Sequence, residues 1–277
     1  MSPTWEENPD ARSGVSFAVP SPGRMVRALL IANIALFVLQ WVVLDGFFPA
    51  TFTFFSDTFA LSPKQWLHFP LAPLWQLVSY GFLHAGPSHL LFNMLFLYFL
   101  GTMLEGELGE RRFISFYLVA VALSGACQLA LGLALGQHAP IVGASGGLMA
   151  VVCAMATLRP QTRLIFILVP VTLRTVALIY IALEVFGAIS QLKGQESNVA
   201  SFAHLSGALF GFLCARYGWI WRDPLEAVAD WRDRRAEVQR SHDAERLDRL
   251  LEKINREGLK TLSGSERAFL KRVAGKR

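Results

Sequence analysis

Four polar side chains interrupt apolar stretches of this chain, and their types are those that carry out acyl transfer. Ser145 stands within the run GASGG, and His204 stands in a separate apolar stretch. A serine hydroxyl becomes a good nucleophile when a base within hydrogen-bond reach takes its proton, and a histidine on another helix can do this. His89 and Asn93, in a third stretch, can donate hydrogen bonds to the oxyanion formed when a carbonyl is attacked. The residue types predict a nucleophile, a base and two oxyanion donors.

The residues next to Ser145 are small. Gly143, Gly146 and Gly147 would let other backbone approach the serine closely, and a serine at a helix N-terminus has free N–H groups beside it. Alone, this run is a weak signal, because serine and glycine in a membrane span more often pack helices. Gly207 and Gly211 have the GxxxG spacing typical of such packing.

The composition places these residues in a membrane protein. Of the 277 residues, 53% are hydrophobic and only 17% are charged, with a mean hydropathy of +0.40, which excludes an ordinary soluble enzyme. Residues 223–277 carry 14 Lys and Arg and 11 Asp and Glu, so a charged tail follows an apolar body. Because both signs are interleaved there, the net charge of +5 argues against nucleic acid as a partner and for a solvated helical surface beside anionic lipid.

The elements that must position the four residues are membrane spans. Five apolar stretches are close to the length needed to cross about 30 Å of hydrocarbon: Ala28–Leu44, Phe113–Leu135, Pro140–Leu158, Thr175–Leu192 and Val199–Tyr217. His84–Leu104 is a weaker sixth span because polar residues interrupt it. Counted at about 1.5 Å per residue, Ser145, His204 and His89 each lie roughly 7 Å inside the outer end of their span. The fold class predicted is all-α, a six-span bundle.

The loops predict orientation and two further segments. Arginines gather on the side of the termini, which predicts that both termini are cytoplasmic, and the short loops suit a bacterial inner membrane. Asp45–Leu83 has no run long enough to cross and is expected to form short amphipathic pieces in the outer interface. Leu164–Thr172, broken by Pro170, is expected to be a cytoplasmic interfacial linker.

The tail contains two helix-start signals. Asp223, Pro224 and Glu226 predict a helix running to about Arg256, and Ser263-x-x-Glu266 is a second capping box that opens a short helix. The apolar stripes of these helices can pack as a hairpin. The three cysteines, in apolar runs without paired spacing, indicate neither a disulfide nor a zinc site: Cys127, Cys153 and Cys214.

Several short strings in this sequence together resemble the rhomboid family of intramembrane serine proteases. They are GFLH (81–84), HLLFNM (89–94), GASG (143–146) and AHLSG (203–207), in that order and spacing. Lesser similarities are Glu105 with Gly109, Arg112 and Phe113, and the VPV at 169–171. The resemblance covers about residues 25–218, between a polar cytoplasmic N-terminus at 1–24 and the charged helical extension at 223–277.

The resemblance implies an endopeptidase that cuts the transmembrane helices of other membrane proteins near the outer face, without a cofactor. Ser145 would be the nucleophile and His204 the base of a dyad that has no third acid, with His89 and Asn93 as oxyanion donors. His84 would be a structural hydrogen-bonder. Glu184, the one carboxylate well inside a span, is expected to be paired within the bundle. The partners implied are substrate transmembrane segments and the lipid bilayer, whereas the partner of the tail is unknown.

Two positions depart from the family's pattern. Met149 stands four residues after the serine, where an aromatic residue often supports the histidine ring, and Gln76 stands where some members have arginine after Trp75. Neither change removes a predicted catalytic group. Both bear on how the histidine and the outer loop are placed.

Other functions fit the sequence less well. A zinc site on His84, His89 and His204 lacks HExxH, and a spacing of five does not align two histidines on one helix face. A transporter would be expected to show paired halves with broken helices. A non-proteolytic relative that binds transmembrane helices would be expected to have lost the serine or the base, whereas this chain has both.

Overall fold

The computed structural model describes residues 21–68, 72–137, 139–166, 169–194, 199–222, 224–258 and 262–274. The chain separates into two compact units, Met1–Arg222 and Asp223–Arg277, of which the first contains all the predicted site residues. Both units are built from helices, and the only strands among the described residues are two short ones in the first unit. The all-α prediction is confirmed.

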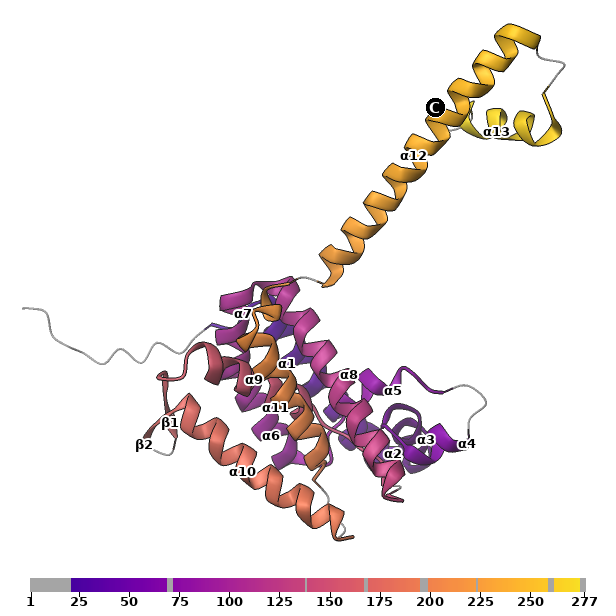
Figure 1. Ribbon diagram of the computed structural model, residues 1–277. Helices are drawn as coiled ribbons and strands as arrows, with labels where there is room; N and C mark the ends of the chain where they lie inside the picture. The colour runs from indigo at the N-terminus through magenta and orange to yellow at the C-terminus, as the bar shows by residue number, and fades with distance from the viewer. Residues whose placement is uncertain are drawn as a thin grey trace, which may run out of the picture. The chain divides into compact units, whose positions relative to one another are not determined.

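The first unit is a bundle of apolar helices (Figure 1). Four continuous helical stretches within the described ranges are long and apolar enough to cross a membrane: Arg24–Phe47, Pro87–Leu108, Glu110–Ala134 and Leu173–Leu192. The first combines α1 (Arg24–Phe37), the π-helical η1 (Val38–Leu44) and α2 (Asp45–Phe47). The second combines α6 (Pro87–Phe96), η3 (Leu97–Gly101) and α7 (Thr102–Leu108). The other two are α8 (Glu110–Ala134) and α10 (Leu173–Leu192).

The remaining two predicted spans are shorter as helices than the sequence indicated. Instead of Pro140–Leu158 and Val199–Tyr217, the helices are α9 (Ser145–Leu158) and α11 (Ser201–Arg216), about 21 Å and 24 Å long. Residues 139–144 are not helical, so the count that put Ser145 about 7 Å along its helix is wrong: Ser145 is the first residue of α9. The helix α9 is buried from Gly146 through Met155, so it need not match the hydrocarbon thickness, because neighbouring helices and not lipid surround it.

The close contact of α9 with α11 depends on two glycines. A Cβ at Gly207 would lie 2.1 Å from the Gly146 carbonyl oxygen, and a Cβ at Gly211 would lie 2.1 Å from the Ala150 carbonyl oxygen. Both distances are far below van der Waals contact, so the two backbones approach as only glycine permits. This contact fixes α11 against the start of α9.

The segment between the first two long helical stretches forms short helices: α3 (Pro49–Phe59), α4 (Pro63–His68), α5 (Gln76–Ser79) and η2 (Tyr80–Phe82). The prediction of short pieces is therefore confirmed. The departure at Gln76 has a structural role here, because its buried side chain accepts from the Ser62 N–H and donates to the Thr58 carbonyl and the Gln65 amide oxygen. This network joins α3, α4 and α5.

The expected linker at Leu164–Thr172 is instead a small hairpin. Strands β1 (Arg163–Phe166) and β2 (Val169–Thr172) pair antiparallel, with Leu164 opposite Val171. Pro170 lies within β2, which a two-stranded sheet tolerates because each strand has one edge that needs no ladder partner. The sequence argument treated the proline as a breaker and overlooked this exception.

A carboxylate from the second long stretch caps the first. The Glu105 side chain in α7 accepts hydrogen bonds from the Met25 and Val26 backbone N–H groups, both at 2.9 Å. These N–H groups belong to the first turn of α1, where no intrahelical acceptor is available and where the helix dipole favours negative charge. A Cβ at Gly23 would stand 2.3 Å from the carboxyl carbon of Glu105, so a side chain there would displace the capping carboxylate.

The second unit is a helical hairpin of α12 (Pro224–Glu257) and α13 (Gly264–Ala274). The predicted helix boundaries are confirmed, although Asp223 lies outside the described residues. An apolar cluster joins the two helices: Leu247, Leu250, Ile254, Leu262, Phe269 and Leu270.

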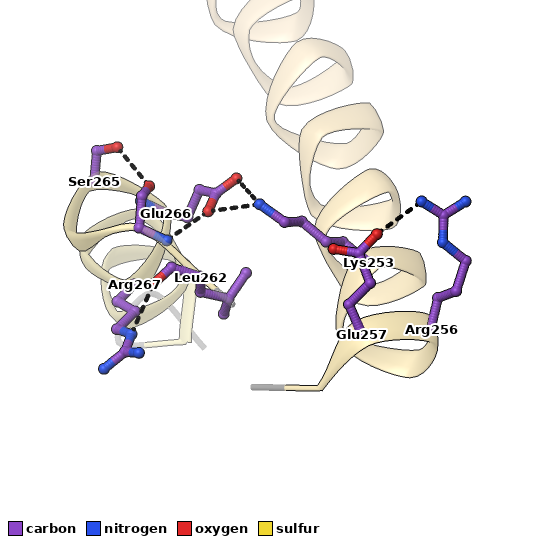
Figure 2. A network of polar contacts seen from close by, with 8 residues as sticks. Lys253, Arg256, Glu257, Leu262, Ser265, Glu266 and Arg267 are labelled. Carbon is purple, nitrogen blue, oxygen red and sulfur yellow. Dashed lines mark hydrogen bonds and ion pairs between the residues drawn. The ribbon is translucent and has the colours of Figure 1, made fainter. Parts of the chain in front are cut away.

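The second capping box is confirmed (Figure 2). The Ser263 N–H donates to the Glu266 carboxylate at 2.7 Å, and the Glu266 N–H donates to the Ser263 hydroxyl at 3.3 Å. The Lys253 ammonium in α12 also contacts this carboxylate at 3.0 Å. The Ser263 N–H, and then Lys253, lower the pKa of the Glu266 carboxyl, which favours the ionised form that both contacts need.

Candidate active site

Ser145 stands at the N-terminus of α9, at the end of an extended segment that is held by backbone hydrogen bonds. Leu61 and Ile141 exchange two of these bonds, at 3.0 and 2.9 Å, and the Gly143 N–H donates to the Tyr80 carbonyl at 2.9 Å. Because α9 begins at Ser145, its first N–H groups have no acceptor inside the helix. The segment therefore fixes both the serine hydroxyl and a set of free N–H donors beside it.

His204 reaches Ser145 from α11. The distance between His204 Nε2 and Ser145 Oγ is 2.6 Å, although the two residues are 59 positions apart in the chain. The start of α11 is itself held by α8, since the Ala203 N–H donates to the Gln128 side-chain oxygen at 3.1 Å. The glycine contacts between α9 and α11 fix the distance that the two side chains span.

His89 lies close to the serine hydroxyl. A Cβ at Gly143 would stand 2.8 Å from His89 Nε2, 2.7 Å from its Cε1 and 3.5 Å from Ser145 Oγ, so ring and hydroxyl share the space that this glycine leaves free. The Ala85 N–H donates to His89 Nδ1 at 3.4 Å. A neutral imidazole that accepts at Nδ1 carries its proton on Nε2, so His89 presents a donor beside Ser145.

Asn93 contributes a buried amide to the same space. Its Nδ2 atom has no hydrogen-bond partner among the described residues, which is uncommon for a buried polar group. The side chain lines two cavities that meet at Ser145 and His204, one of about 590 Å³ that also contains His89 and one of about 70 Å³. A donor without a partner, facing a cavity that holds a nucleophile, is suited to an incoming oxygen.

The structure gives His84, Gly146 and Gly147 packing positions. His84 is fully buried, its carbonyl accepts from the Trp41 indole N–H at 2.9 Å, and its ring lies edge-on to His89 with 5.1 Å between centroids. Neither of its ring nitrogens has an aligned partner among the described residues. A Cβ at Gly146 would meet Ser124 and one at Gly147 would meet Val121, each at 2.6 Å, so both glycines face α8.

Glu184 corrects the expectation of a dyad without a nearby acid. Its Oε1 atom in α10 lies 2.9 Å from His204 Nδ1, on the opposite side of the ring from Ser145. Counted along the predicted spans, Glu184 lies about eight residues from the outer end of its span and His204 about five, so residue counting puts them at different depths. That count neglects helix tilt and the reach of two long side chains. The usable signal was that Glu184 is the one carboxylate well inside an apolar span.

The metal alternative can be compared with the geometry. Within the ranges that the structure describes, no group of three or more His, Cys, Asp or Glu residues is placed to hold a metal ion. Cys127, Cys153 and Cys214 are free thiols.

The apolar helices of spanning length and the polar residues buried between them define the class of an all-α polytopic membrane protein. Within this class the chain belongs to the rhomboid family, because residues 72–221 match the Rhomboid domain. It has the intramembrane-protease-like fold of that family. Residues 232–276 match a second family, DUF6576, whose function is unknown.

Curated relatives match part of the chain. The chain is 33% identical over 157 residues to the presenilin-associated rhomboid-like protein, mitochondrial, of Rattus norvegicus, covering 55% of this chain and 41% of that protein. It is 35% identical over 152 residues to RHOMBOID-like protein 2 of Arabidopsis thaliana, covering 52% of this chain and 44% of that protein. The chain thus spans less than half the length of these relatives.

Proposed function

We propose that this protein is an intramembrane serine endopeptidase that cleaves transmembrane helices of membrane proteins near their outer end. The observation that carries the proposal is the 2.6 Å contact between Ser145 Oγ and His204 Nε2, made by two helices at a half-buried position. A serine and a histidine in hydrogen-bond contact are the minimum arrangement for nucleophilic acyl transfer. Membership of the rhomboid family supports the same reaction class.

The reaction proceeds through an acyl-enzyme. His204 Nε2 takes the proton from Ser145 Oγ while that oxygen forms a bond to the scissile carbonyl carbon. The tetrahedral intermediate collapses when the C–N bond breaks and His204 gives the proton to the leaving amine. A water molecule then attacks the ester, with His204 again as base and then acid, which releases the new carboxylate and restores the serine.

The oxyanion of the tetrahedral intermediate can accept hydrogen bonds from three donors. The Ser145 N–H at the start of α9, the Nε2–H of His89 and the amide of Asn93 surround the cavity next to Ser145 Oγ. Donors already in place at a site of developing charge lower the barrier without reorganisation at the moment of reaction.

The proposal extends to organisation and location. Residues 25–218 form the protease domain, 1–24 a polar cytoplasmic N-terminus, and 223–277 an extension that packs on itself. The distribution of loop arginines supports an orientation with both termini in the cytoplasm, and the proposed membrane is a bacterial inner membrane. In this orientation the bond cleaved in the substrate lies toward the outer face of the membrane.

Purified protein is expected to cut a single-pass reporter just inside the outer end of its span. A peptide bond in a regular helix has its carbonyl hydrogen-bonded, so the substrate helix must unwind before Ser145 can attack. Gly or Pro beside the bond lowers the cost of unwinding by about 1–3 kcal/mol per residue. Mass-spectrometric mapping of the cut site, on reporters with Gly and Pro or with Leu at these positions, measures this. Equal cleavage rates on both reporters would show that unwinding of the substrate helix does not limit cleavage. The absence of a cut in either reporter would contradict the proposed protease function.

Asn93→Ala is expected to lower kcat by about 10²-fold with little change in KM. The variant lacks one oxyanion donor, and the hydrogen bond from that donor forms in the transition state but not in the bound substrate. The reporter assay with purified variant and wild type gives both constants. Asn33→Ala is the matched control. The Asn33 side-chain amide is also buried on a helix, but it donates a hydrogen bond to the Leu29 carbonyl and lines neither site cavity. An Asn93→Ala variant with wild-type kcat would make Asn93 a packing residue.

A further inference from the structure

Glu184 is the one carboxylate on α10, a mostly apolar helix whose other charged residue, Arg174, lies in its first turn. Large side chains exposed on α10 include Leu183 and Phe186, which are 62% and 73% exposed and suit a lipid-facing surface. The Glu184 side chain points the other way and is only 12% exposed. A carboxylate in such a position is costly unless it has a polar partner, and the Glu184 Oε1 atom lies 2.9 Å from His204 Nδ1.

The two ring nitrogens of His204 have different partners. Nε2 lies 2.6 Å from Ser145 Oγ, and Nδ1 lies 2.9 Å from Glu184 Oε1. A carboxylate accepts hydrogen bonds and cannot donate them, so its presence at Nδ1 favours the tautomer with a proton on Nδ1 and a lone pair on Nε2. That lone pair is what Ser145 needs. The Nδ1 contact is close but not aligned as a straight hydrogen bond, so a small rotation of either group completes it.

The carboxylate also faces a ring that must carry charge during the reaction. When His204 takes the serine proton it becomes an imidazolium, and a negative group 2.9 Å from Nδ1 stabilises that cation in a site sheltered from water. The other polar side chains of the small cavity that holds both groups are an amide and two hydroxyls, from Asn93, Ser145 and Tyr180, and none of them is a carboxylate. Glu184 is therefore the one formal negative charge beside His204 in this cavity.

We propose that Glu184 is a positioning residue that holds His204 in the tautomer and orientation required for proton transfer, so that this chain uses Ser145, His204 and Glu184 as a serine–histidine–acid triad. The proposal rests on the proposed protease function. Glu184 touches neither the serine nor the substrate, and it acts through the histidine. Its placement on α10 makes three separate helices, α9, α10 and α11, contribute one member each.

The test is Glu184→Gln in the full-length protein, which keeps size and removes charge. We expect kcat on the transmembrane reporter to fall by about 10²-fold, with KM within about twofold of wild type, because an amide fixes neither the tautomer nor the charge. The matched control is Glu107→Gln. Glu107 forms an ion pair with Arg159 at 2.8 Å in the same unit, but at a position that lines neither site cavity, so this variant should keep wild-type kcat.

A spectroscopic measurement distinguishes two roles for Glu184: positioning the His204 ring, or only holding α10 against α11. In detergent-solubilised protein labelled with ¹⁵N-histidine, the His204 ring signals, assigned by their loss in His204→Asn, report which nitrogen carries the proton. We expect protonated Nδ1 in wild type and a changed tautomer population in Glu184→Gln. Wild-type ring shifts together with wild-type kcat in a folded Glu184→Gln protein would overturn the proposal.

Two outcomes remain to be distinguished. If Glu184→Gln does not fold, Glu184→Asp decides: a carboxylate drawn back by one methylene should lower kcat by about 10-fold, and an unchanged kcat overturns the proposal. If wild-type protein cuts no reporter and reacts with no serine probe, the proposed function fails. In that case the ¹⁵N-histidine spectra of wild type and Glu184→Gln still decide whether Glu184 determines the tautomer of His204.

Discussion

Replacement of Ser145 by alanine is expected to abolish cleavage of a transmembrane reporter, with a loss of about 10⁵-fold or more in kcat. The hydroxyl that contacts His204 at 2.6 Å is then missing, and no other group in the cavity can form the acyl-enzyme. Alanine is compatible with the first turn of α9 and adds no atoms, so the fold should persist. The measurement is reporter cleavage together with covalent labelling by a fluorophosphonate, which reports the nucleophile directly.

The control for the labelling experiment is Ser124→Ala. Ser124 is fully buried on α8 and faces Gly146, so its hydroxyl is near the proposed nucleophile in space but not in contact with His204. Its variant should be labelled like wild type. Labelling of Ser145→Ala at the wild-type rate, or substantial turnover by it, would contradict the assignment of the nucleophile.

Gly143→Ala is expected to reduce kcat by about 10³-fold while the bundle stays folded. Gly143 has φ of +130°, which a residue with a Cβ rarely adopts, and that Cβ would stand 2.7 Å from His89 Cε1. Relief of this clash moves either the ring or the segment that leads into Ser145. A displacement of about 1 Å in a catalytic group can cost about 10²-fold, and loss of an oxyanion donor adds to it.

Gly136→Ala is the matched control for backbone strain. Gly136 also has positive φ, +69°, but a Cβ there meets no atom within 4 Å. Gly136→Ala should lose a small amount of stability in thermal unfolding, from backbone strain alone, and should keep its activity, whereas Gly143→Ala should lose activity. If the two variants have the same kcat, the space at Gly143 is not needed for the site.

The helices and the proposed catalytic pair of Ser145 and His204 could be predicted from the sequence, because hydrophobic runs and the polar residues that interrupt them are local signals. Ser145 and His204 were recognisable as polar side chains in apolar stretches, and the structure places them 2.6 Å apart. The capping box at Ser263 and Glu266 is local in the same sense, since its two members lie within one helical turn.

The features that the sequence did not reveal depend on tertiary placement. The late start of α9 follows from the pairing of Leu61 with Ile141, which are far apart in the chain and carry no periodic signal. The contact of Glu184 with His204 depends on how α10 lies against α11, which residue counting along straight helices cannot give. The role of Gln76 likewise depends on three short helices meeting around one amide.

The carboxylate at Glu105 imposes an order on the protein's biogenesis. Its two acceptor bonds go to Met25 and Val26, 80 and 79 residues earlier in the chain, so the ribosome makes the donors long before it makes the acceptor. Until residue 105 has been synthesised and inserted, the first turn of the N-terminal helix must be hydrated or bound to lipid headgroups. The segment that begins at Arg24 therefore reaches its final state only after the segment that contains Glu105 has joined it, which makes their association an assembly step and not a property of either helix alone.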